Sequence, residues 1–564
     1  MPDPSLSMTP KVDEPNEPAF PHVGSRGDVG AEVCATAASG AGLPGGAAWL
    51  SHVTDRDGAD EFGLMIRLLP NQVVVGVVGE VDMATAPDLG CLLGALIDRG
   101  HTDVVLELAR LDFLDSSGLH AIGDTAARLR PSGGVLRIRS PTARTRPLLD
   151  VCEVSGLVEF EPSDPDLVPL GSEQPAGDNT TIVTAASAEA TVDVGWATAM
   201  PDGHDVVDAA ALWRSVLPTV AEISRARRRL HAKALFIVAI VVASYWAAVI
   251  SAWSAAIRIG SAGVLAMGLI AVATGIMHDA NHGAFSRHRW LNRLVSYVAD
   301  ILGTSSWLWR FKHNVLHHAA TNIEGVDTDL AQAPFARLSP GQPWHSWHRY
   351  QHVYLWPLYG FMGLKNLIIG DLGNLATSRI GPQALRTRPS RNDLLHIAAG
   401  KLAHLGLFVV VPVLYNPWWA VLVFYLCISW VVGFVLAVTF QLAHCVEGML
   451  FTDESSPHRG KDFVAHQLAT TTNVASPLPA IGHVFRWLVG GLDHQIEHHL
   501  GTRLPHTALA AVGGKFRLLC IDLGVDYHEH AGLWTGLRSH GRWLKRMGQP
   551  PSTASPQPVQ LGCI

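Results

Sequence analysis

Three histidine clusters are the part of this sequence best suited to carry out chemistry. The clusters read His278-Asp-Ala-Asn-His282, His313-Asn-Val-Leu-His317-His318 and His494-Gln-Ile-Glu-His498-His499. Histidine is the commonest metal ligand in proteins, and residues four apart lie on one face of a helix. Each cluster can therefore direct at least two imidazoles at a common point, and the three together can surround more than one metal ion.

The number of candidate ligands indicates the kind of metal chemistry. A structural zinc ion takes four ligands, and the clusters offer more than that. Imidazole suits iron, copper and zinc, and two such ions point to dioxygen activation or to hydrolysis. Since each cluster lies beside strongly apolar sequence, a buried apolar chain is the expected substrate. Such a chain has C–H bonds and no bond to hydrolyse, which favours an oxidative centre over hydrolysis. A pH-sensing or helix-capping role is the alternative, but without a metal it would leave many imidazoles half-satisfied.

Four apolar stretches must position these clusters. Ala234 to Trp253 carries no charged residue, and neither does Ile259 to Met277. Both reach the length of a transmembrane helix. A further apolar region from Leu402 to Ala443 is broken at Asn416-Pro417 and is long enough for two more crossings.

Charge then orients the four crossings. The basic residues from Arg225 to Lys233 precede the first crossing, which predicts that its N-terminal side is cytoplasmic. Two crossings return the chain to this side just before His278, and the last two return it just before His444. All three clusters are therefore expected on the cytoplasmic face of the cell membrane, with His444 as a further candidate ligand.

Bulk composition agrees with a membrane protein of several domains. The chain has 564 residues, more than one ordinary domain holds. Its formal net charge of −7 argues against a nucleic-acid partner. Mean hydropathy is +0.21. The 7 cysteines are scattered without a Cys-x-x-Cys pair, so we expect reduced thiols and no disulfide framework.

The composition divides the chain into five parts. Residues 1–61 lack periodicity and are expected to be disordered. Residues 62–160 alternate strand and helix patterns, which predicts a small α/β sandwich. Residues 161–205 are typical of a linker. Residues 206–545 are predicted to be an all-α integral membrane domain with about four transmembrane helices and a cytoplasmic helical cap. Residues 546–564 are expected to be a disordered tail.

The region from about 230 to 545 resembles the membrane fatty acid desaturases, a family of di-iron enzymes with three histidine boxes. The resemblance is carried by the three clusters, by Thr321-Asn322 and by Phe440-Gln-Leu-Ala-His444. The Gln495-Ile-Glu-His-His form of the third box is similar to the acyl-lipid and linoleoyl-CoA-like branch. The resemblance implies two iron ions, with dioxygen as co-substrate. The implied ligands are His278, His282, His313, His317, His318, His444, His498 and His499.

The third box leaves one ligand position open. In the family pattern Gln495 takes the first place of a (His/Gln)-x-x-His-His box and is the favoured residue facing the metal. His494 repeats the spacing of the second box and is the alternative ligand. Several polar neighbours are expected to orient the imidazoles. These are Asp279, Asn314, Asp327, Asp329 and Asp493.

The N-terminal domain carries a second resemblance. Gly79-Glu-Val-Asp82 and the stretch Leu111-Asp-Phe-Leu-Asp115-Ser116-Ser117-Gly118-Leu119 resemble the STAS domain of anti-sigma-factor antagonists. The resemblance implies that Ser116 is the phosphoacceptor of a partner kinase. Charge added at a helix N-terminus is locally favourable. The alternatives are a serine that only caps the helix and a domain used only for docking to a partner.

These observations predict a membrane oxidoreductase that introduces a double bond into a fatty acyl chain, with the STAS domain regulating or docking it. The acyl carrier is left open among acyl-CoA, acyl-carrier protein and phospholipid. No His-Pro-Gly-Gly haem motif is present, so a separate electron donor such as ferredoxin is expected. The alternatives are a hydroxylase with the same metal centre and a membrane-tethered STAS signalling module that senses lipid.

Overall fold

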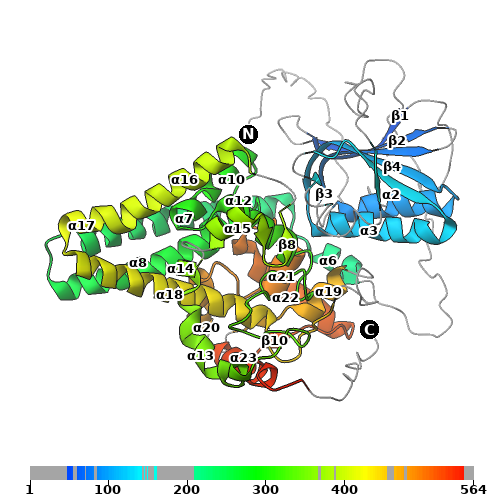
Figure 1. The fold of residues 1–564 in the computed structure, drawn as a ribbon. Helices are drawn as coiled ribbons and strands as arrows, with labels where there is room; N and C mark the ends of the chain where they lie inside the picture. Colours follow the sequence, from blue (N-terminus) through cyan, green and yellow to red (C-terminus); the bar gives the residue numbers. More distant parts are fainter. Residues whose placement is uncertain are drawn as a thin grey trace, which may run out of the picture.

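The structure is a computed structural model, and it describes most of the chain. The described residues are 47–54, 60–69, 72–81, 85–142, 145–146, 149, 158–161, 209–365, 370–385, 389–453, 463–475 and 479–551. Within them, a small α/β domain is followed by a mostly helical domain (Figure 1). This confirms the predicted fold class. The expected linker after residue 161 and the expected tail after residue 551 lie outside the described residues.

The α/β domain is built on one mixed sheet whose six strands follow one another in chain order. The first three strands pair antiparallel, and the later pairs are parallel. The strands are β1 (Ala47–Thr54), β2 (Asp60–Leu68), β3 (Val73–Val81), β4 (Asp103–Leu114), β5 (Val135–Arg139) and β6 (Glu159–Phe160).

Two helices cross between the parallel strands on one face of this sheet (Figure 1). They are α2 (Ala86–Asp98) and α3 (Ser116–Leu129). In α2 the leucines at helical spacing are fully buried against the sheet, because they form the helix's single apolar face.

The start of the α/β domain departs from the prediction for residues 1–61. Strand β1 lies inside that segment and pairs with β2. Its sequence, AAWLSHVT, lacks clean alternation, and its pairing shifts register between Trp49 and Ser51. The neighbouring strand therefore supplies order that local periodicity does not indicate. Reduced thiols were also expected, but Cys91 is disulfide-bonded.

Four helical stretches are long and apolar enough to cross a membrane, as predicted. They extend to the left of the view in Figure 1. The first joins α7 (Val220–Tyr245) to η2 (Trp246–Ile250), and the second joins α8 (Ala255–Ala271), η3 (Val272–Met277) and α9 (His278–Asn281). The third joins α16 (Arg391–Leu405), η7 (Gly406–Val410) and α17 (Val411–Tyr415), and the fourth is α18 (Trp418–His444).

The sequence explains the ends of these stretches. Asn416 is extended, with φ −143° and ψ 154°, and separates α17 from α18. Proline disfavours the helical region for the residue before it, so Pro417 ends one span and begins the next. Large apolar side chains such as Leu235 and Leu414, each 74% exposed, point away from the protein. Their exposure fits a lipid surrounding.

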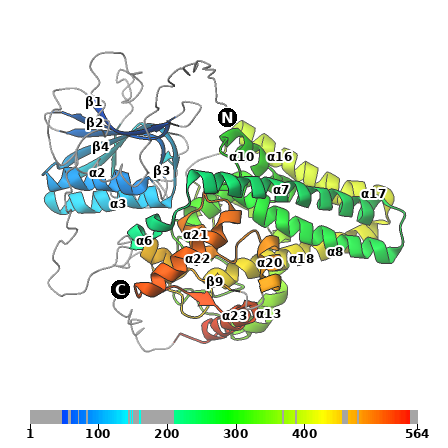
Figure 2. The same ribbon diagram turned by 180° about the vertical axis from the view of Figure 1, so that it is seen from behind.

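Shorter elements form a cap at the end of the spans that carries His278 and His444 (Figure 2). The first of them, α6, begins at Ala209, and the last, α23, ends at Met547, close to the predicted limits of 206–545. The helices of the cap are α6 (Ala209–Val216), α10 (Arg289–Ser296), α11 (Val298–Ile301), α12 (Ser306–Arg310), η4 (Phe311–His317), η5 (Ser346–Tyr350), α13 (Gln351–Tyr359), α14 (Met362–Lys365), α15 (Asp371–Thr377), α19 (Phe463–Thr470), α20 (Pro479–Leu488), α21 (Gln495–Leu500), α22 (His506–Asp522) and α23 (Leu533–Met547). The two small sheets pair β7 (Arg379–Ile380) with β8 (Gln383–Ala384) and β9 (Asn473–Val474) with β10 (Glu529–His530).

Candidate metal centre

The first histidine box lies at the end of the second span. The π-helix η3 leads directly into α9, where His278 and His282 are one helical turn apart. Their rings are 4.7 Å apart between centroids. The helical spacing therefore brings both imidazoles to the same side, as the sequence predicted.

The second box is set by a π-helix, η4. Its wider turn is visible in the bond from the backbone N–H of His318 to the carbonyl of His313, five residues earlier, at 3.0 Å. In this wider turn His313, His317 and His318 all lie close together, with ring centroids 4.7 to 5.5 Å apart. Such π-turns are frequent at functional sites.

The third box and the end of the fourth span complete the cluster. Helix α21 carries His498 and His499, and His444 is the last residue of α18. The rings of His444 and His499 are 4.7 Å apart between centroids. The prediction from topology that His444 lies with the three boxes is therefore consistent with the geometry.

The imidazoles gather into two groups whose possible ligand atoms lie within 4.8 Å of one another. All these histidines are at most 5% exposed. The first group contains His278, His282, His313 and His498, and the second contains His317, His444 and His499. His318 lies between the groups, with its Nε2 3.2 Å from that of His313 and its ring 4.2 Å from that of His499.

In the second group, a carboxylate holds one nitrogen of His317. Its Nδ1 lies 3.2 Å from both oxygens of Asp327 and 3.6 Å from Asp329. A histidine that donates Nδ1–H to a carboxylate keeps Nε2 as the basic nitrogen, which is the arrangement found around protein-bound metals. The expectation that Asp327 orients an imidazole agrees with this contact.

The other two rings of the second group are held in the same way. Nδ1 of His444 faces the carbonyl of Thr470 at 3.3 Å, and Nδ1 of His499 faces Oε1 of Gln467 at 2.9 Å. Gln467 is fully buried and also donates to the carbonyl of His318. Each ring is therefore fixed with Nε2 directed away from its anchor.

Several Nε2 atoms in this cluster have no hydrogen-bond partner although they are buried. They belong to His282, His444, His498 and His499. Buried polar atoms are almost always satisfied, so a group of orphaned nitrogens facing one another requires an explanation. Metal ions bound by these nitrogens would satisfy them, and the donor set, rich in imidazole, suits a first-row transition metal.

The electrostatics of the cluster favour neutral rings. Burial lowers the pKa of His313, His318, His498 and His499 well below the ordinary value, and neighbouring histidines lower it further. For His317 burial opposes protonation, but the charges of Asp327 and Asp329 raise its pKa overall. Most rings are thus already in the form that binds metal.

Three residues expected to orient the imidazoles have other partners. Asp279 accepts from the backbone N–H and ring of His506, at 3.0 and 2.9 Å. Asn314 donates to the carbonyl of Asn281, and Asp493 accepts from Arg486. These contacts do not decide whether the three residues orient the imidazoles, which stays a prediction. Successive helical residues point in different directions. Asp279 therefore cannot face the same way as His278.

The two candidates at the third box occupy different surroundings. Gln495 is buried in the first turn of α21, and its Nε2 has no partner. His494 precedes the helix, and its ring lies 3.6 Å from Glu497 and 3.8 Å from Asp493. His494 belongs to no possible metal group among the described residues. Both ring nitrogens of His494 are buried without a hydrogen-bond partner as well, so the choice between Gln495 and His494 stays a prediction.

A buried network behind the third box was not anticipated. Glu497 is fully buried and accepts from Asn473 and from the hydroxyl of Tyr527, both at 2.8 Å. Asn473 also accepts from the backbone N–H of Ile496 through its Oδ1. These contacts hold α21 in place. The one feature of the sequence that could have indicated this network is Glu497, the acidic residue inside the third box.

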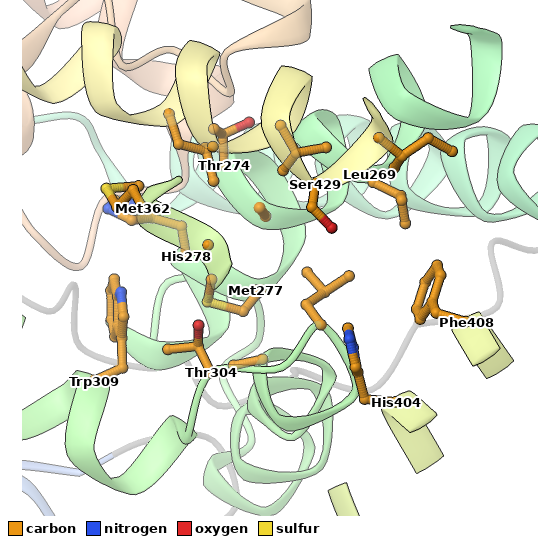
Figure 3. A pocket seen from close by; sticks show the side chains of 18 of the residues that line it. Leu269, Thr274, Met277, His278, Thr304, Trp309, Met362, His404, Phe408 and Ser429 are labelled. Carbon is orange, nitrogen blue, oxygen red and sulfur yellow. The ribbon is translucent and has the colours of Figure 1, made fainter. Parts of the chain in front are cut away.

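A mostly apolar cavity extends from the first box into the membrane-spanning helices. His278 and Trp309 line one end, and His404 and Phe408 line the other (Figure 3). The stripe of lining residues on α18 runs from Phe424 to Phe440, about 24 Å at 1.5 Å per residue. The cavity is suited to an extended hydrocarbon chain that reaches the histidines at one end of the cavity.

The candidate phosphoacceptor lies at the N-terminus of α3. Asp115 caps this helix by accepting from the backbone N–H groups of Ser117 and Gly118, at 2.9 and 3.1 Å. A Cβ on Gly118 would come within 2.6 Å of Leu114 and Val81, so this position requires glycine. The backbone places Ser116 as the first residue of the helix, and the cap alone does not require a serine there.

Comparison with known proteins identifies both domains. The family model described as Fatty acid desaturase matches residues 259–531, and the STAS domain model matches residues 64–166. The chain is 33% identical to an sn-1 linoleoyl-lipid 6-desaturase from Arthrospira platensis over 51% of its own length and 78% of the relative's. It is 33% identical to an acyl-lipid (8-3)-desaturase from Physcomitrium patens over 56% of its length and 66% of that protein's.

Proposed function

The chain belongs to the fatty acid desaturase family, and from this we propose that it introduces a double bond into the acyl chain of a membrane lipid. One observation supports the proposal above the others. Buried imidazoles with orphaned Nε2 atoms stand at the end of a cavity shaped for a hydrocarbon chain. A cavity lined mostly by apolar side chains excludes water, which protects the acyl chain and the oxidant from side reactions.

We propose that the metal is iron and that two ions bind. His278, His282, His313 and His498 would hold one ion, and His317, His444 and His499 would hold the other. His318 and Gln495 are adjacent donors that complete these sets. The two ions would supply the oxidising power that C–H cleavage with dioxygen requires. The protein's own contribution is to fix the rings through Asp327, Thr470 and Gln467.

The relatives' names support an acyl group esterified in a lipid as the substrate. One relative is a linoleoyl-lipid desaturase and another an acyl-lipid desaturase. We propose the same carrier here, with acyl-CoA and acyl-carrier protein as the rivals. Electrons would come from a separate protein such as ferredoxin, and the STAS domain and the histidine boxes would lie on the cytoplasmic side.

The proposal is tested by expressing the full chain in a host and analysing its membrane lipids. A new unsaturated acyl chain is expected, and it should be absent with His498→Ala, a variant that keeps its place in the membrane. A hydroxylated acyl chain instead would identify the hydroxylase alternative. Neither product, with iron bound and reductant present, would favour the lipid-sensing alternative.

We propose further that Ser116 is phosphorylated by a partner kinase or bound by an anti-sigma-like partner. Support comes from the match to the STAS domain and from the position of Ser116 at a helix N-terminus. Ser116→Ala should keep basal desaturation and lose any kinase-dependent change. Mass spectrometry that maps the phosphate to another residue would refute this assignment.

A further inference from the structure

The STAS domain is held against the helical domain by ion pairs. Arg289 donates to Glu80 from Nε and Nη2, at 3.2 and 2.9 Å, and its Nη1 lies 2.8 Å from Asp112. Arg503 also pairs with Glu80 and lies over the ring of Phe113, 4.9 Å from its centroid. Glu80 in β3 and Asp112 in β4 therefore pair with two arginines of the helical domain. Both ribbon views place β3 on the side of the STAS domain nearest the helical domain (Figures 1 and 2).

These two arginines lie next to the metal centre. Arg289 is the first residue of α10, shortly after His282, and Arg503 follows His499 by four residues. The side chain of Arg503 runs past Gly283, with Nε 3.7 Å from where a Cβ on that glycine would lie. Arg289 and Arg503 therefore lie on the loops that follow the first and third boxes.

The surrounding surface is also basic. Arg227 in α7 donates to the carbonyl of Ala284 at 3.4 Å, which brings the basic turn of α7 to the loop of the first box. The neighbouring Arg228 and Arg229 are exposed. A concentrated positive surface attracts an acidic protein and speeds its association.

The contact between the two domains is suited to opening. Asp112 and Arg289 are 50% and 45% exposed, and exposed ion pairs contribute little each and are screened by salt. Arg503 and Glu80 are less exposed, at 24% and 19%. Among the described residues, no cluster of buried apolar side chains includes members of both domains. The domains thus share a polar, reversible contact rather than a common core.

We propose that the STAS domain is an intrachain cap whose Glu80 and Asp112 keep an acidic electron-donor protein off Arg289 and Arg503. The proposal rests on the proposed desaturase function, which requires external electrons. While the cap is docked, the two arginines are already paired with carboxylates. Release of the cap exposes them beside the metal centre, where a donor must approach to transfer electrons.

The test compares the wild-type full chain with the double variant Glu80→Lys/Asp112→Lys. Asp98→Lys is the matched control, because Asp98 is an exposed acid of the same domain that pairs with Arg128 and not with the helical domain. Two quantities are measured for each protein in lipid nanodiscs: the Kd for an acidic ferredoxin, and the initial rate of acyl desaturation driven by reduced ferredoxin or by dithionite.

The double variant should bind ferredoxin about tenfold more tightly, as expected when a competing charge is removed. Its ferredoxin-driven rate should rise and its dithionite-driven rate should stay the same. The control should match the wild type.

Unchanged or weaker ferredoxin binding by the double variant would overturn the proposal. So would stronger binding only to anionic lipid vesicles, because the arginines would then serve lipid head groups. If neither reductant yields product from the wild type, the proposed desaturase function is refuted. The Kd for ferredoxin would still decide whether the STAS domain excludes an acidic protein.

Discussion

At the scale of single residues, the contacts of Nδ1 define the site as much as the direction of Nε2, the nitrogen left to bind metal. A spacing of four residues gathers imidazoles, but it does not say which nitrogen carries the proton. Asp327, Thr470 and Gln467 settle this for His317, His444 and His499 by engaging Nδ1. The site is therefore arranged for metal through partners that lie on other elements.

This arrangement predicts the effect of Asp327→Asn. The amide cannot hold His317 with the charge of the carboxylate, so metal affinity and turnover should fall about 10- to 100-fold. Metal content by elemental analysis and product formation measure both. Asp393→Asn is the control, since Asp393 pairs with Arg293 away from the cluster, and it should behave as wild type. Full metal loading in Asp327→Asn would contradict the role given to this carboxylate.

The pKa shifts predict how many protons metal binding releases. His313, His318, His498 and His499 have a lowered pKa, so in the folded, metal-free protein they are already neutral at pH 6.5 and have no proton to lose. His317 has a raised pKa and is protonated there. Titrating chelator-treated protein with Fe²⁺ near pH 6.5 should release about one proton per chain. Release of several protons would contradict this, and Asp327→Asn should lower the number.

At the scale of elements, the sequence predicts features that depend on local patterns better than contacts between residues far apart in the chain. The four spans follow from apolar runs, and the gathering of the box histidines follows from their four-residue spacing, so both can be predicted from short windows of sequence. Gln467 lies 32 residues from His499, and no spacing rule connects the two. Strand β1 likewise owes its order to β2. Side chains that act across elements, such as Tyr527 on Glu497, are visible only in three dimensions.

The contact between α18 and the C-terminal end of α13 predicts a separation of metal binding from substrate use. Gly433 lines the cavity, and a Cβ there would lie 2.5 Å from the carbonyl of Gly360. Gly433→Ala should therefore push the two elements apart at a cost of about 1–3 kcal/mol. Turnover should fall about tenfold while the metal content is kept, because the change reshapes the cavity and leaves the histidines in place.

The matched control for this variant is Gly263→Ala in α8, where a Cβ would meet no atom within 4 Å. It should keep turnover within about twofold of wild type. Acyl-chain analysis by gas chromatography measures turnover for both variants. If Gly433→Ala also loses metal, the cavity and the metal centre are less independent than the structure indicates.

At the scale of the whole molecule, the fold joins a soluble domain to the end of the spans that carries the histidines. The contacts of Arg289 and Arg503 with Glu80 link that domain to the loops of the first and third boxes. The sequence predicted both domains separately, because each has its own local pattern. It gave no indication of their contact, because Glu80 and Arg289 are 209 residues apart.

The same architecture predicts the orientation of the chain in the membrane. Four crossings place Arg228, in the basic first part of α7, and Cys445, after the fourth span, on one side, and basic residues favour the cytoplasm for that side. Ala252, exposed in the turn between η2 and α8, should then face outward. In a variant without native cysteines, Ala252→Cys should react with a membrane-impermeant maleimide in intact cells, and Arg228→Cys only after permeabilisation. The reverse pattern would put the metal centre outside, away from cytoplasmic electron donors, and would contradict the proposed source of electrons as well as the orientation.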